Sequence, residues 1–159
     1  MNSDSTGIYV DDTELVRMFR QLSVEQMRQI GKAAFEHSLP IIQQSAIGVL
    51  ASEGINIDSI DPRSHKSLKE GATVKAYDDG SGGSVTAFGE FKAKWFATGT
   101  SERYQNIKHG HEKAGNPARY LGRIEATNFL TKGYEFAESM YETTLEDYIL
   151  DSIDRLMNR

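Results

Sequence analysis

The sequence predicts an α+β fold, because helical periodicity occurs towards both ends of the chain and strand-like alternation occurs in the middle. Helices and strands that are segregated along a chain are typical of this class. The 159 residues fit one domain, and no internal repeat divides them. We therefore expect a single domain over residues 1–159, in which two long helices pack on a small antiparallel sheet.

Two helix signals stand near the start of the chain. The first follows Asp11-Asp12-Thr13, and residues 1–12 are expected to be a flexible N-terminus. Its apolar residues have helical spacing: Leu15, Met18, Phe19 and Leu22. The second signal is a capping-box sequence from Ser23 to Gln26, and the apolar stripe after it predicts a long helix to about Ser52.

Pro40 lies inside this second helix. Proline removes a backbone hydrogen bond and clashes one turn back, so a kink is expected at residues 36–40. The alternative is two helices that join at Ser38-Leu39.

The middle of the chain predicts strands. Residues 72–77 and 84–88 alternate around the glycine-rich turn at 79–83, which indicates a hairpin. The segment Phe91–Ala97 (FKAKWFA) alternates apolar residues with lysines, which predicts a further strand. Residues 98–122 lack periodicity and are expected to form a long projecting loop, except that 119–126 can form one more strand.

The end of the chain predicts an amphipathic helix of about 26 residues, roughly 39 Å long. Its apolar positions recur every three or four residues: Leu130, Tyr134, Ala137, Tyr141, Leu145, Tyr148, Ile149, Ile153 and Leu156. Acidic residues fall mostly between them.

Composition restricts the classes of function. The absence of cysteine excludes disulfides, thiolate zinc sites and a cysteine nucleophile. No stretch approaches the roughly 20 apolar residues of a membrane span, so no membrane partner is expected and the product is expected in the cytosol. The net charge of −5 does not favour a protein that wraps nucleic acid.

The charge is unevenly distributed. From residue 134 onwards, seven acidic side chains oppose two arginines, a net of −5. Between residues 98 and 122, four basic side chains oppose two acidic ones, a net of +2. Opposite charges on different segments suit head-to-tail association of identical copies, although a mixed solvated surface explains them equally well.

Only one motif favours catalysis. His109, His111 and Glu112 could bind a metal ion, since imidazole nitrogen and carboxylate oxygen are common ligands, and the alternative function is therefore a small metal-dependent hydrolase. The glycine-rich turn has no lysine and no following helix, as a phosphate-binding loop requires, and no nucleophile elbow is present. We expect neither an enzyme nor a bound cofactor or metal.

The stretch Phe91–Tyr104 (FKAKWFATGTSERY) resembles the tail-completion family of long-tailed, lambdoid-type bacteriophages, the minor tail proteins of the head–tail connector. The features that carry the resemblance are the aromatic pair Trp95-Phe96, the turn Gly99-Thr100 and the basic residue Arg103. A second similar stretch runs from Arg123 to Leu130. The long helices at both ends also match the family.

The resemblance implies a structural protein of the virion, assembled in the host cytoplasm as a homo-oligomeric ring, with hexameric symmetry suggested. Its partners would be the connector or adaptor and the tail-tube or tail-terminator proteins, and genomic DNA would pass through the ring without specific binding. The expected assembly interface comprises Trp95, Phe96, Gly99, Thr100, Arg103, Tyr104, Lys108, Lys113, Arg119 and Phe129. A further alternative is an adaptor that binds another protein through the C-terminal helix.

Overall fold

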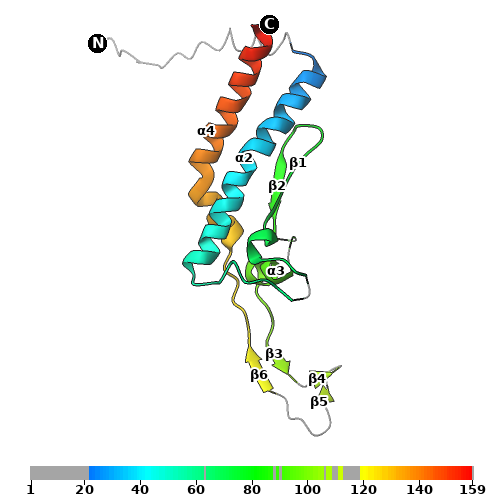
Figure 1. Cartoon of the computed structure of the whole chain (residues 1–159), viewed down its shortest axis with the longest axis vertical. Helices are drawn as coiled ribbons and strands as arrows, with labels where there is room; N and C mark the ends of the chain where they lie inside the picture. Colours follow the sequence, from blue (N-terminus) through cyan, green and yellow to red (C-terminus); the bar gives the residue numbers. More distant parts are fainter. Residues whose placement is uncertain are drawn as a thin grey trace, which may run out of the picture.

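The computed structural model of this chain describes residues 22–62, 64–87, 89, 91–105, 107–108, 111–112 and 119–158. Two long helices, α2 (Val24–Ser52) and α4 (Phe129–Met157), lie side by side and antiparallel (Figure 1). A β-hairpin packs along α2. A ribbon of short strands extends beyond the end of the helix pair where α2 finishes and α4 begins. The predicted α+β class is confirmed. Residues 1–21, which hold most of the first helix signal and the expected flexible terminus, lie outside the described residues.

The capping box at the start of α2 is confirmed. The Ser23 hydroxyl accepts a hydrogen bond from the backbone N–H of Gln26 at 3.2 Å, and the Gln26 side chain accepts one from the backbone N–H of Ser23 at 2.8 Å. These bonds satisfy backbone donors that have no partner within the helix. The helix then continues for 29 residues.

The helix α2 passes through Pro40 without interruption, so the alternative of two helices joined at Ser38-Leu39 is wrong. Leu39 and Ile42 on either side of the proline are buried in the hydrophobic core. Burial of an apolar face stabilises a helix more than local propensity does, which explains how the helix tolerates one missing hydrogen bond. The expected kink at residues 36–40 stays a prediction.

Close approach of the helix backbones positions α4 on α2. A Cβ atom added at Gly133 of α4 would overlap the backbone nitrogen and Cα of Ala46 in α2. Ala46, Leu50 and Phe129 are fully buried around this contact. Two small residues thus let the helix backbones touch next to the hydrophobic core. The predicted C-terminal helix is confirmed over Phe129–Met157.

The predicted hairpin is confirmed as β1 (Thr73–Ala76) and β2 (Gly83–Thr86), with Val74 opposite Val85. Its turn lies against the first half of α2. Lys32 Nζ forms an ion pair with Asp78 Oδ1 at 2.7 Å, and Arg28 donates a hydrogen bond to the Asp78 carbonyl. These contacts hold the turn of the hairpin against α2.

Residues Phe91–Thr98 form a helix, α3, so the prediction of a strand in this segment is wrong. Ala93, Phe96 and Ala97 contact the core, and their spacing of three and four positions is helical. The alternation of lysines with apolar residues does not reflect a strand, and Lys92 has a separate structural role. Lys92 forms an ion pair with the buried Asp61 at 2.9 Å, which attaches α3 to the segment after α2.

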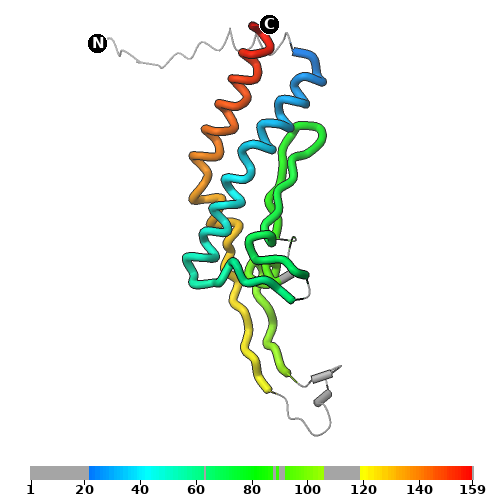
Figure 2. Tube along the Cα trace, in the orientation of Figure 1, coloured from blue at the N-terminus to red at the C-terminus, as the bar shows by residue number. Residues whose placement is uncertain are grey.

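The segment 98–122, expected to be a long projecting loop, contains short paired strands. Strand β3 (Arg103–Gln105) pairs with β6 (Arg119–Gly122), and β4 (Ile107–Lys108) pairs with β5 (His111–Glu112). Figure 2 shows the two sides of this ribbon leaving the helical body next to each other. The strand expected at 119–126 is confirmed for 119–122. We call residues 100–126 the arm.

The Gly133–Ala46 contact makes a stability prediction. Changing Gly133→Ala should destabilise the fold by about 1–3 kcal/mol, because the helices must separate to admit the new methyl group. Changing Gly48→Ala should stabilise it by about 0.5–1 kcal/mol, since nothing lies within 4 Å of that added Cβ and alanine favours helix. Urea unfolding followed by circular dichroism measures both changes. Equal midpoints for the two variants would contradict the close contact.

Candidate functional site

The root of the arm is the most distinctive local structure, and Gly99 begins it. The Gly99 N–H donates to the Trp95 carbonyl at 2.7 Å and so ends α3, and the residue then adopts a left-handed φ of +72°. An added Cβ would lie 3.1 Å from the Ile124 carbonyl oxygen and 3.1 Å from the Ala126 nitrogen. Both the conformation and the space favour glycine.

Two threonines join the outgoing and returning sides of the arm. The Thr100 N–H donates to the Ile124 carbonyl at 2.9 Å, and the Ile124 N–H donates to the Thr100 hydroxyl at 3.0 Å. On the returning side, the N–H and hydroxyl of Thr127 both donate to the Phe96 carbonyl, at 2.8 and 3.0 Å. The chain therefore leaves and re-enters the body at one hydrogen-bonded point.

Arg103 lies just outside this root. Its guanidinium carbon is 5.9 Å from the centroid of the Trp95 ring, a distance at which the cation and the aromatic face attract each other. Its Nε is buried and has no hydrogen-bond partner in the described part of the chain. Arg103 therefore links the first strand of the arm to α3 through its side chain.

Further out, the arm exposes a pair of tyrosines and one leucine. The rings of Tyr104 and Tyr120 lie 5.3 Å apart across the β3–β6 pair. Tyr104 is 45 % exposed, Tyr120 53 % and Leu121 49 %. The Tyr104 hydroxyl donates to Glu102 at 3.0 Å, and this bond raises the pKa of Tyr104 above its usual value. The phenol stays neutral, and tyrosine in such a position is typical of protein–protein interfaces.

The residues predicted for assembly are only partly brought together. Trp95, Phe96, Gly99, Thr100 and Arg103 converge on the root, and Tyr104 and Arg119 are exposed beyond it. Phe129 is fully buried in the core. Phe129 can therefore support the root from inside the core, but its side chain is not accessible to another copy. Lys113 and the side chain of Lys108 lie outside the described residues.

Sequence reasoning missed Tyr120 and Leu121. A strand was expected at 119–126, which includes both residues, but its partner strand with Tyr104 was not identified. The pairing itself joins residues separated by the whole arm. No local pattern predicts such a contact.

The described residues offer little for catalysis. Among them, no group of three or more histidine, aspartate or glutamate side chains is placed to bind a metal ion. His109 and the side chains of His111 and Glu112 lie outside the described residues. Within the described ranges, neither long helix is apolar enough to cross a membrane.

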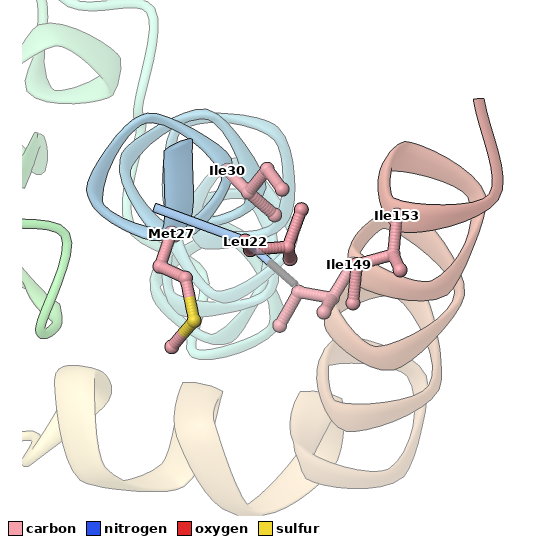
Figure 3. A pocket seen from close by; sticks show the side chains of 6 residues that line it. Leu22, Met27, Ile30, Ile149 and Ile153 are labelled. Atoms are coloured by element: carbon pink, nitrogen blue, oxygen red, sulfur yellow. The ribbon is translucent and has the colours of Figure 1, made fainter. Parts of the chain in front are cut away.

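A cavity of about 180 Å³ lies between α2 and α4 at the end far from the arm (Figure 3). The residues that line it are Leu22, Met27, Ile30, Gly31, Ile149 and Ile153. The lining is apolar, and none of the side chains named carries an ionisable or nucleophilic group.

Comparison with known proteins adds no relative, since no protein-family model, curated protein or solved structure matches this chain.

The hydrogen bonds at the root make a second prediction. Changing Thr100→Val should leave the partly buried Ile124 N–H without an acceptor and cost about 1–3 kcal/mol locally, so amide exchange at Ile124 should accelerate roughly tenfold or more. Changing Thr143→Val is the matched control, because its hydroxyl donates to the Ser139 carbonyl on an exposed face of α4, away from the root. Hydrogen exchange read by NMR measures both. Unchanged exchange at Ile124 in Thr100→Val would show that the root does not depend on this bond.

Proposed function

We propose that this chain is a non-catalytic structural subunit of the head–tail joint of a long-tailed phage. Identical copies would form a ring between the connector and the tail tube. The observation that carries the proposal is the root of the arm. The two stretches that resemble the tail-completion family, near Gly99-Thr100 and near Ile124–Thr127, are far apart in sequence and hydrogen-bond to each other.

The shape of the chain supports a role in assembly. The arm extends beyond the C-terminal end of α2 and the start of α4 (Figure 1), and it carries the exposed Tyr104, Tyr120 and Leu121. Exposed apolar groups in water are costly unless a partner covers them. A neighbouring subunit or the next ring of the particle would provide that cover.

The charge distribution supports the same role. Glu138, Glu142 and Glu146 are all exposed along α4. Such acidic surfaces repel phosphate groups, so DNA would pass a ring of these subunits without binding to it. The subunit would need no cofactor and would act through contacts with itself, the connector and the tail proteins.

One observation favours a second candidate, an adaptor that binds another protein through its C-terminal helix. Phe136 and Met140 on α4 are exposed although both are large and apolar. An isolated adaptor would form a stable dimer or a one-to-one complex through α4. Light scattering distinguishes this case from a ring of many copies.

The proposal predicts that the arm is needed for joining and not for folding. Replacing residues 104–121 by a short Gly-Ser turn keeps the root and Arg103, so the melting temperature should change by less than about 3 °C, a shift that corresponds to about 1 kcal/mol. Expressed from the phage genome, the variant should yield free heads and free tails in electron micrographs. Val24→Ser, at an exposed site on α2, is the control that should still give joined particles. Joined particles from the armless variant would overturn the proposal.

A separate measurement addresses the metal-dependent alternative. Metal content of protein purified without an affinity tag should be negligible under the structural proposal. Stoichiometric metal that disappears in the His109→Ala and His111→Ala double variant would instead favour the hydrolase.

A further inference from the structure

The helix α4 carries a second stripe that its own fold does not cover. Its core-facing residues include Gly133 and Ala137, which are buried against α2. The second stripe follows alternating steps of four and three residues: Phe136, Met140, Thr143, Asp147, Leu150, Asp154 and Met157. This spacing places them on one face of the helix. Phe136 is 79 % exposed, Met140 65 % and Leu150 48 %.

A groove runs beside the first part of this stripe. Two adjoining hollows of about 360 and 450 Å³ lie between α2 and α4. Phe136 and Ser45 line both of them, and Ile41, Gln44, Gly48 and Met140 contribute to one or the other. Gly48 leaves the floor open, because nothing lies within 4 Å of a Cβ added there. The result is an apolar concave surface with an aromatic rim.

We infer that this groove, with the stripe on α4, receives the arm of a second copy of the chain. The inference rests on the proposed role of the arm in assembly and adds the surface to which the arm binds. We call the groove and the stripe together the receiving face.

Complementary chemistry identifies the occupant. The arm presents exposed Tyr104, Tyr120 and Leu121, an apolar projection that suits an apolar hollow. Residues 98–122 carry a net charge of +2, whereas residues 134–159 carry −5. Arg119 is exposed next to Tyr120, and Asp147 and Asp154 lie on the stripe. Opposite charges around an apolar centre favour this pairing over arm against arm or helix against helix.

The geometry requires that the two surfaces come from different copies. The arm follows α3 in sequence and leaves the body near the C-terminal end of α2. It extends away from the helix pair (Figure 2). Its root is fixed by hydrogen bonds on both sides, from Thr100 to Ile124 and from Thr127 to Phe96. The arm therefore extends away from its own receiving face, and the arm of a second copy would occupy that face. A contact between two different patches is heterologous, and repeated heterologous contacts close into a ring or continue as a filament.

Cysteine cross-linking tests the pairing directly, because the natural chain has no cysteine. One variant carries Leu121→Cys on the arm and the other carries Met140→Cys on the receiving face. Both positions are exposed, so neither change disturbs the core. Equal amounts are mixed at high concentration and oxidised with a copper–phenanthroline catalyst. The disulfide between the two variants should exceed each homodimer by about fivefold or more, as expected for complementary surfaces.

Two controls define the result. Val24→Cys lies at the exposed start of α2, and its mixture with Met140→Cys should give only the random ratio of products. Adding Asp147→Lys and Asp154→Lys to the Met140→Cys chain should lower the mixed disulfide about fivefold or more, since like charges then face the arm. A predominant Met140→Cys homodimer, or a mixed yield equal to the Val24→Cys control, would overturn the inference.

The test also separates this inference from the proposed function. If no preferential cross-link forms but the armless variant still fails to join heads to tails, the receiving face is wrong and the role in assembly stands. If the cross-link forms and the armless variant nevertheless gives joined particles, the pairing stands and the phage role fails.

Discussion

The functional architecture depends on one constraint, the set of hydrogen bonds that ties Thr100 to Ile124 and Thr127 to Phe96. A two-stranded ribbon alone is only marginally stable in water. Here both strands are attached to the helical body at the same point, and α3, which supplies Phe96, is itself held on the core through the buried Ala93. The helical body therefore anchors the two-stranded ribbon, and the ribbon extends beyond the body.

Much of the fold was predictable from local signals. The helix α2 has a capping box and a long apolar stripe, and α4 has apolar residues at regular helical spacing, so both follow from sequence alone. The segment FKAKWFA was misread because seven residues satisfy strand and helix periodicity equally. The segment forms a helix because Ala93, Phe96 and Ala97 then contact the core. That contact depends on tertiary structure.

The candidate site was predictable in part. Gly99 and Arg103 follow from the sequence, and both contact Trp95 at the root. The exposed cluster of Tyr120 and Leu121 was missed, because the pairing of β3 with β6 links residues that are distant in sequence. Phe129 illustrates the opposite error. Its place in a similar stretch suggested an exposed contact, yet an aromatic residue at the start of a core helix is more simply explained by burial.

In the proposed ring, the left-handed turn at Gly99 would influence the number of subunits. For identical subunits joined end to end, the angle between the donating and accepting surfaces determines how many units complete one revolution. The turn and its neighbouring hydrogen bonds would set that angle within each monomer, before any partner is met. Curvature would then be an intrinsic property of the single chain, and a small rotation at this glycine would convert a closed circle into an open spiral.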